Sequence, residues 1–151
     1  MTAHTIPIDA ERELEEFIAR CEDGLRHQVS GDSGPFLEVW SRAEDIAILG
    51  AIGSHAHGWQ DVRTHILAAA TTLNWTHVSI QRLLTIVDDA VAITVTLENM
   101  SREGEQRTEA RTLRVTHAYR REGDEWRLVL RHANTVTADD EARERSILGH
   151  T

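Results

Sequence analysis

The order of two hydrophobic patterns along the chain is the feature that most constrains its fold. In the first half, apolar residues recur every three or four positions, which is typical of helices that bury one face. In the second half, four segments rich in Val, Ile, Leu and Thr are separated only by short polar turns, which is typical of an antiparallel meander. Helices followed by a run of strands predict an α+β fold, with the helices packed on one face of a single sheet.

The two patterns also predict where the elements lie. A long helix is expected over residues 9–29, a short helix from Pro35, a short strand over 46–49 and a third helix over 59–73. The predicted strands of the second half span residues 76–87, 90–98, 108–121 and 125–136. The 151 residues suffice for one core. We therefore expect one domain over residues 1–137 and a C-terminal tail over 138–151, either as a loose helix or as a frayed end.

Charge and composition argue against several classes of function. The chain has 25 acidic and 16 basic residues, a formal charge of −9 and no lysine, so a nucleic-acid surface or an anionic membrane surface has no electrostatic support. No segment is long and apolar enough to span a bilayer, and no signal-peptide pattern opens the sequence, which predicts a cytoplasmic protein. The glycines at 50, 53 and 58 form no nucleotide-binding motif, and no cofactor is expected. Cys21 lies on the apolar stripe of the first helix and is expected to be buried rather than catalytic.

Three stretches resemble the SnoaL-like branch of the nuclear transport factor 2-like superfamily, which includes ketosteroid isomerases, polyketide cyclases and the kinase II association domain. They are GDSGPFLEVWS at 31–41, DIAILGAIGSHAHGW at 45–59 and RVTHAYRREGDEWRLVLRHAN at 114–134. The resemblance implies a cone, in which a strongly curved, mostly antiparallel sheet wraps around the long first helix and two shorter helices. It also implies a small-molecule pocket at the open end of the cone and a homodimer formed through the outer sheet face.

Strand alternation predicts which side chains of the last hairpin line this pocket. With residue 120 placed opposite 126 across the turn near Gly123, one face carries Arg114, Thr116, His132 and Asn134. We predict His132 as a general acid or base, and Arg114 or Asn134 as the group that polarises a carbonyl. The alternative is that His132 is a structural histidine and that Arg114 pairs with an acid.

The reverse face of the same hairpin mixes aromatic, aliphatic and arginine side chains, a composition suited to a protein interface. We predict it as the dimer contact, with these residues: Val115, His117, Tyr119, Val129 and Arg131. On this assignment the only tyrosine of the chain points away from the pocket.

Aromatic and histidine residues near the expected opening give further candidates. Trp40, Trp59 and Trp75 are expected either as pocket walls or as core residues. His55 and His57 would point the same way on an extended segment, and we place His55 at the pocket. Two histidines do not make a metal site, and no spacing requires a third ligand, so no metal is predicted.

The resemblance also tests particular chemistries. Aligned on isomerase sequences, the position of the catalytic aspartate falls on Gly50, which cannot transfer a proton, so ordinary steroid isomerisation is not expected. One hypothesis is a pocket for a carbonyl-bearing small molecule with acid/base chemistry of the cyclase, dehydratase or isomerase type. The alternative is a non-catalytic dimeric module for sensing or assembly, resembling the kinase association domain.

Overall fold

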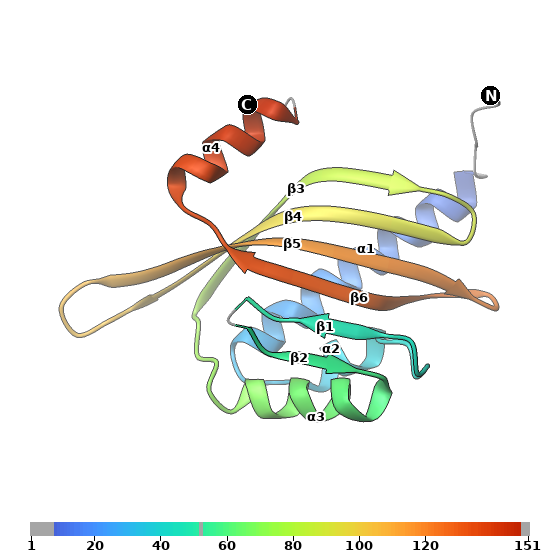
Figure 1. The fold of residues 1–151 in the computed structure, drawn as a ribbon, viewed down its shortest axis with the longest axis horizontal. Coiled ribbons are helices and arrows are strands. Elements are labelled where there is room, and N and C mark those ends of the chain that lie inside the picture. Colours follow the sequence, from blue (N-terminus) through green and yellow to red (C-terminus); the bar gives the residue numbers. More distant parts are fainter. Residues whose placement is uncertain (1–7, 52, 149–151) are drawn as a thin grey trace.

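The computed structural model describes residues 8–51 and 53–148 and contains, within them, helices and strands in the predicted order (Figure 1). The elements are α1 (Ile8–Val29), α2 (Gly34–Val39), β1 (Ala47–Leu49), β2 (His55–His57), α3 (Trp59–Ala70), β3 (His77–Val87), β4 (Val91–Glu103), β5 (Thr108–Glu122), β6 (Glu125–Thr135) and α4 (Ala138–Ile147). Strand β2 is the one element among these that the hydrophobic pattern does not predict, because three residues are too few to show a period.

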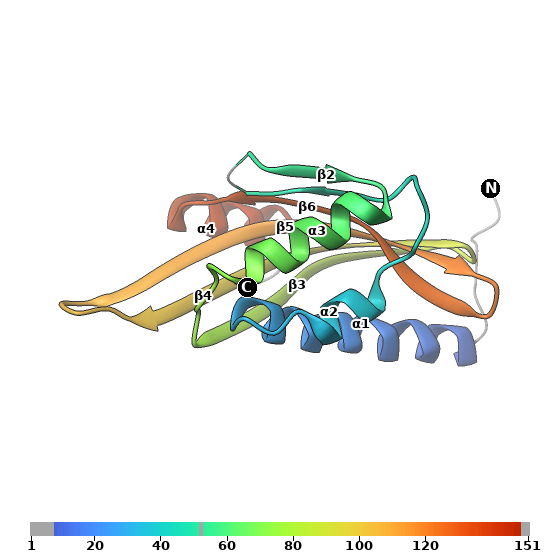
Figure 2. The ribbon, with the colours of Figure 1, turned by 90° about the horizontal axis from the view of Figure 1, so that it is seen from below.

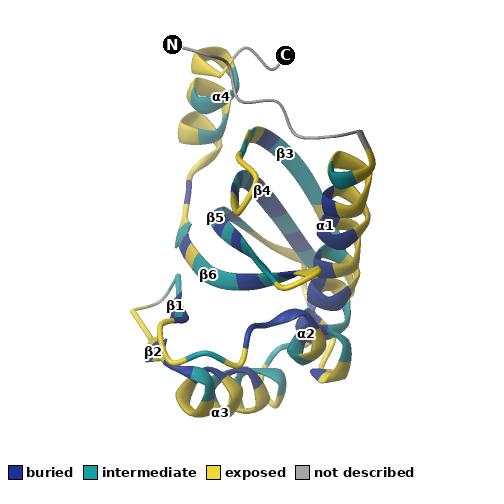
Figure 3. Ribbon diagram, turned by 90° about the vertical axis from the view of Figure 1, so that its right-hand side faces the viewer, coloured by how far each residue is buried: buried dark blue, intermediate teal, exposed yellow. Residues whose placement is uncertain are grey.

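The six strands form one sheet in the order β2-β1-β6-β5-β4-β3, in which only the β1–β6 pair is parallel. The sheet curves strongly, with α1, α2 and α3 on its concave side and α4 apart from them (Figures 2 and 3). The expected α+β cone is therefore confirmed. No helix within residues 8–51 and 53–148 is long and apolar enough to cross a membrane.

Helix α1 forms much of the core, as its three-and-four spacing predicts. Its apolar stripe is buried against the concave face of the sheet: Leu14, Phe17, Ile18, Cys21, Leu25 and Val29. Gly24 lets α2 approach closely, because a Cβ at this position would meet Phe36 Cα at 3.0 Å. The close contact fixes α1 and α2 as one side of the cone.

The β5–β6 hairpin departs from the predicted register at two points. The turn consists of only Gly123 and Asp124, so that Arg120 pairs with Arg127 rather than with residue 126. Farther along, Tyr119 pairs with Leu128 but Ala118 pairs with Leu130, which leaves Val129 as an extra residue in a β-bulge. Because side chains alternate along a strand, one extra residue moves all following side chains of β6 to the opposite face.

The dimer contact predicted on this hairpin is therefore wrong in its residues. Val115, His117 and Tyr119 lie on the concave face and are 0%, 6% and 2% exposed, and Arg131 pairs with His117 on that face. Val129 packs partly buried against the core. The homodimer itself stays a prediction, without these residues as its contact.

Helix α4 lies at the convex face, where β6 leaves the sheet. Leu83, Leu97 and Val136 form a small buried cluster there, separate from the main core. Arg145 of α4 donates two hydrogen bonds to Gln81 of β3, at 2.9 and 2.8 Å. The expected loose C-terminal helix is thus an ordered α4 over the residues described, tied to the sheet by polar contacts.

Candidate functional site

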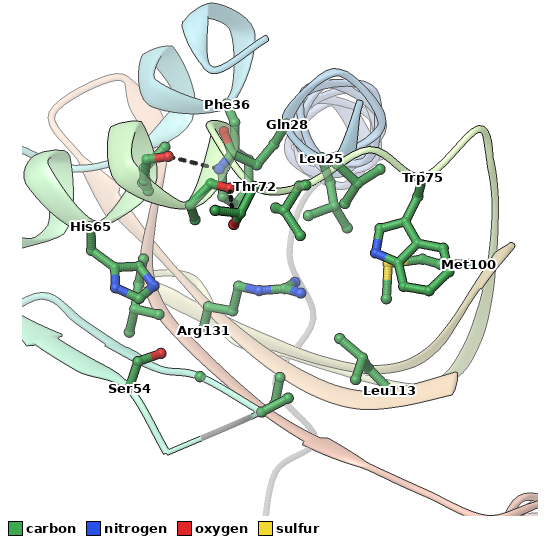
Figure 4. A pocket seen from close by; sticks show the side chains of 18 of the residues that line it. Leu25, Gln28, Phe36, Ser54, His65, Thr72, Trp75, Met100, Leu113 and Arg131 are labelled. Atoms are coloured by element: carbon green, nitrogen blue, oxygen red, sulfur yellow. Dashed lines mark hydrogen bonds between the residues drawn. The ribbon is translucent and has the colours of Figure 1, made fainter. Parts of the chain in front are cut away.

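A cavity of about 390 Å³ lies between the concave face of the sheet and helices α1 and α3 (Figure 4), which is within the usual range for small-molecule sites. Most of its walls are apolar: Leu25, Val29, Phe36, Ile48, Ile66, Leu73, Trp75, Met100, Leu113 and Ala133. Four lining residues, Ser54, Ala68, Thr72 and Arg111, are exposed, and Ala68 belongs to α3, so the cavity reaches solvent beside this helix. Its volume and mostly apolar walls suit a small, largely apolar molecule.

Arg131 of β6 brings a guanidinium group into this apolar cavity, and its side chain is only 12% exposed. Its Nη1 and Nη2 atoms each donate a hydrogen bond of 2.8 Å to the carboxylate of Glu98, a residue of β4 that is 1% exposed. Burial alone would lower the pKa of Arg131, but the charge and hydrogen bonds of Glu98 outweigh burial and raise it. The guanidinium therefore stays charged inside the protein.

His117 of β5 completes a buried cluster with this pair. Arg131 Nη1 also donates to His117 Nε2 at 3.0 Å, so this nitrogen is an acceptor and the ring carries its proton on Nδ1. Burial, and then the charge of Arg131, hold the pKa of His117 well below its ordinary value. The cluster Glu98–Arg131–His117 thus contains one negative charge, one positive charge and a neutral imidazole.

Arg131 keeps donors free for a ligand. Three of its five N–H groups are used by Glu98 and His117, while the Nε–H and the second Nη2–H meet no acceptor among the described residues. With the edge between Nη1 and Nη2 occupied by Glu98, these two N–H groups lie along the neighbouring edge of the planar guanidinium. One ligand oxygen in the cavity can accept both.

His65 of α3 is the second titratable side chain at the cavity, where it lies with Ser54 toward one end and Trp75, Met100 and Leu113 toward the other, with Arg131 between them (Figure 4). Burial, and then the charge of Arg131, lower the pKa of His65, so the imidazole is neutral near pH 7 and able to accept a proton.

Buried hydrogen bonds hold the turn of α3 that carries His65. Gln28 Nε2 of α1 and Ser33 Oγ both donate to the carbonyl of Ile66, at 2.9 and 3.3 Å. Val62 and Ile66 of the same helix are 0% and 1% exposed. The position of His65 over the cavity is therefore determined by its neighbours.

The residues predicted as catalytic lie outside the cavity. The structure places Arg114, Thr116, His132 and Asn134 on the convex face, as the bulge requires, and none of them lines the cavity. Arg114 forms an ion pair with Glu144 of α4, which confirms the alternative that it pairs with an acid, and His132 is exposed. Placing these four at the pocket was wrong, and a catalytic role for His132, Arg114 or Asn134 stays a prediction without geometric support.

Only one of the three tryptophans expected near the opening reaches the cavity, and it is Trp75. Trp40 is 1% exposed and packs edge-on against Phe36, with ring centres 6.0 Å apart. Trp59 lies under the guanidinium of Arg42, 3.8 Å from its ring centre. Both therefore have packing roles rather than pocket roles.

His55 and His57 are exposed on β2, and neither lines the cavity. The described part of the chain contains no group of three or more side chains arranged to bind a metal ion. Gly50 does line the cavity, and a Cβ there would meet Ser54 Oγ at 2.5 Å. The cavity wall at Gly50 thus carries no carboxylate.

The assignment of Tyr119 to the outer face is also wrong. Its hydroxyl group lies 2.9 Å from Thr94 Oγ1, and its ring packs edge-on against Phe17 of α1. Tyr119 is buried below α1 and does not line the cavity, while burial raises the pKa of its hydroxyl group. It is a core residue.

Sequence reasoning missed two polar residues that line the cavity, His65 and Arg131, and the buried partner of Arg131, which is Glu98. Glu98 carries a visible signal, because a carboxylate inside an apolar strand segment calls for a buried cationic partner. His65 sits beside Val62 and Ile66 on the buried face of a predicted helix. Arg131 has no such signal, since the bulge at Val129 decides its face.

Comparison with solved structures shows the same fold in proteins of different names. A candidate calcium/calmodulin-dependent protein kinase type II association domain from Thiobacillus denitrificans matches with a TM-score of 0.70 and 18% identity over 91% of this chain and 100% of that chain. A candidate dehydratase of the NTF2-like family from Streptomyces avermitilis matches with a TM-score of 0.68 and 15% identity over 88% and 100%. A candidate ketosteroid isomerase from Parabacteroides distasonis gives a TM-score of 0.66 and 18% identity over 83% and 89%.

Comparison with curated proteins finds no match. The family model described as the SnoaL-like domain matches residues 21–138, which is most of the chain and includes every residue of the cavity described above. The matched segment runs from the middle of α1 to the first residue of α4. The chain therefore belongs to the SnoaL-like domain family and has the nuclear transport factor 2-like fold.

Proposed function

We propose that this protein binds an apolar small molecule with a carbonyl group in the cone, and removes a proton from the carbon next to that carbonyl. The observation that carries the proposal is the guanidinium of Arg131, which has two N–H donors without an acceptor among the described residues and lines a cavity with mostly apolar walls. His65 lines the same cavity and supplies a neutral imidazole. A donor pair and a base at one site are the two parts that enolisation needs.

The proposed reaction begins when the carbonyl oxygen accepts hydrogen bonds from Arg131. An imidazole nitrogen of His65 takes the proton from the neighbouring carbon, and the electrons of the broken C–H bond move to the oxygen as an enolate. Arg131 stabilises the negative charge that develops there. The proton on His65 is then returned in one of three ways. It goes to another carbon of a conjugated enolate, to a hydroxyl group on the carbon two bonds from the carbonyl carbon, which leaves as water, or to the alkoxide formed when the enolate attacks a second carbonyl. These correspond to isomerase, dehydratase and cyclase reactions.

The structural neighbours support both this proposal and its alternative. A candidate dehydratase and a candidate ketosteroid isomerase share the fold, and so does a candidate kinase association domain. One fold that hosts such different activities does not select among them. The proposal therefore depends on the cavity residues rather than on the neighbours' names.

Deuterium exchange tests the proposal without knowledge of the natural substrate. Acetylnaphthalene is a flat ketone with acidic methyl protons, and in heavy water the protein should replace those protons with deuterium faster than buffer does, as followed by proton NMR. The His65→Gln variant should exchange more slowly by a factor on the order of 100 to 10,000, the usual contribution of a general base. His132→Gln, the matched change on the convex face, should leave the rate unchanged.

Two results would overturn the catalytic part. One is deuterium exchange at the rate of buffer alone while acetylnaphthalene is bound. Binding is measured by displacement of the fluorescent dye prodan from the cavity. The other is an equal rate in wild type and His65→Gln. Failure of prodan and acetylnaphthalene to bind at all would overturn the binding part as well.

The alternative function, a non-catalytic assembly module, is favoured by one observation on the convex face. Leu84, Ile86 and Val91, at the end of the sheet formed by β3 and β4, are 36%, 53% and 44% exposed, and Ile86 pairs across the strands with Ile93. We propose a second copy of the chain as the partner of this face. Sedimentation should show a dimer that Ile86→Glu converts to monomer, and a monomeric wild type would contradict this.

A further inference from the structure

We propose that Glu98 makes the cavity selective for neutral carbonyl compounds over the corresponding carboxylates. The inference rests on the proposed function and narrows its ligand class. Glu98 itself does not line the cavity, so it acts on the ligand through Arg131 as a specificity-determining residue.

The cluster Glu98–Arg131–His117 has no net charge. The carboxylate of Glu98 already neutralises the guanidinium of Arg131 through two hydrogen bonds of 2.8 Å, and His117 is an uncharged acceptor. A carboxylate ligand on the free edge of Arg131 would add a second negative charge to the same guanidinium. Two carboxylates that share one site in a poorly hydrated interior disfavour each other's ionised form.

The surroundings do not offset that repulsion. Arg111 is the other cationic side chain among the lining residues, but it is exposed and lies beside Trp75, with its guanidinium carbon 5.8 Å from the ring centre. Glu22 of α1, whose carboxylate interacts with that of Glu98, is itself paired with Arg82 at 3.9 Å, so it adds no positive charge to the cluster. The cluster that holds Arg131 therefore carries no net positive charge that would offset an added carboxylate.

A neutral carbonyl meets no such penalty. It loses less solvation than a carboxylate on entering an apolar cavity, and its oxygen can accept both the Nε–H and the free Nη2–H of Arg131. The geometry of the guanidinium edge suits a ketone, an ester and a carboxylate alike. Charge, rather than shape, is thus what separates these ligands.

Matched naphthalene probes test the inference at neutral pH, with prodan displacement as the readout. Naphthalene measures apolar binding alone, acetylnaphthalene and methyl naphthoate add a neutral carbonyl, and naphthoate adds the charge. In wild type the two carbonyl compounds should bind more tightly than naphthalene, and naphthoate should bind at least about tenfold more weakly than methyl naphthoate. Equal or tighter binding of naphthoate would overturn the inference.

Glu98→Gln tests the role of the residue itself, because it removes the charge and keeps a planar group of the same shape. In this variant naphthoate should bind at least about tenfold more tightly than in wild type, while methyl naphthoate should change by less than about threefold. Glu144→Gln, the same change in the Glu144–Arg114 pair of the convex face, should alter neither affinity. An unchanged preference in folded Glu98→Gln would overturn the role of Glu98.

The outcomes separate this inference from the proposed function. If no naphthalene compound displaces prodan and no deuterium exchange occurs, the proposed function fails. If acetylnaphthalene binds and exchanges but naphthoate binds as tightly as its methyl ester, only the charge selectivity fails. Should Glu98→Gln not fold, as judged by circular dichroism, the ester-to-acid ratio in wild type decides alone, and a ratio near one overturns the inference.

Discussion

The two faces of the β5–β6 hairpin carry the same kinds of side chain in opposite surroundings. On the concave face, Arg131 and His117 are buried and linked to each other and to Glu98. On the convex face, His132 is exposed and Arg114 pairs with α4. Arginine and histidine are therefore available on both faces, and only the concave face places them where water is scarce. The chemistry that an arginine and a histidine can support on this hairpin therefore depends on whether they lie on the concave or the convex face.

The largest expected contrast between the faces is in stability. Arg131→Ala leaves the carboxylate of Glu98 buried without its partner, and this should lower the free energy of unfolding by about 3 to 5 kcal/mol. Arg114→Ala removes an arginine that is 41% exposed. Its partner Glu144 is 14% exposed but lies on α4, which has no buried residue and can shift to hydrate that carboxylate, so the cost should be lower, about 1 kcal/mol. Urea unfolding of both variants measures the difference. Equal losses of unfolding free energy in the two variants would contradict the difference in burial between the faces.

The next contrast is in the pH dependence of folding. His117 has a pKa well below its ordinary value in the folded protein, so below about pH 6.5 the unfolded chain binds a proton that the folded chain does not. Stability should therefore be fully present above that pH and fall as the pH is lowered, by up to about 1.4 kcal/mol per pH unit from this one group. Unfolding free energies at several pH values measure this slope.

Variants of His117 and His132 show which of the two histidines causes the pH dependence of the unfolding free energy. His117→Gln should flatten the dependence below about pH 6.5, since the variant has no group there to titrate. His132→Gln, on the exposed face, should keep the slope of the wild type. A wild-type slope in His117→Gln would show that other groups cause it and would contradict the buried neutral imidazole.

The smallest contrast concerns the volume of the cavity. Ala69→Leu places three more carbons at the cavity wall and should weaken the binding of acetylnaphthalene by about threefold to tenfold, through loss of space rather than loss of polar contacts. Ala118→Leu adds the same atoms to the convex face, where Ala118 pairs with Leu130, and should leave binding unchanged. Calorimetric titration of both variants distinguishes them, and weaker binding in Ala118→Leu alone would move the site to the other face.

The helices and the four long strands, β3 to β6, follow directly from the sequence. Helix α1 was predicted to within one residue of its start, because its buried stripe recurs with the period of a helix over its whole length. The β-rich segments and their turns were also predicted, since each strand has several apolar positions and a polar connection. A prediction based on a pattern that extends over many residues does not depend on the exact position of any one residue.

The candidate site depends on one residue, Val129, which is the extra residue of the β-bulge. A single inserted residue does not change the periodic pattern of the sequence enough to be predicted. Without the bulge at Val129 and with the predicted turn, His132 would face the cavity, and with the observed register Arg131 does. Trp126 and Leu128 precede the bulge and are buried, so the bulge leaves their face unchanged. The error is confined to β5 and to the part of β6 beyond Val129.

A crystal structure of the protein with acetylnaphthalene bound tests the central claim most directly. We expect the naphthalene ring between the apolar walls near Trp75, the carbonyl oxygen within hydrogen-bond distance of Arg131 Nε and Nη2, and the methyl carbon toward His65. A ligand on the convex face beside Arg114 and His132 would contradict the account. So would a ligand in the cavity whose carbonyl points away from Arg131.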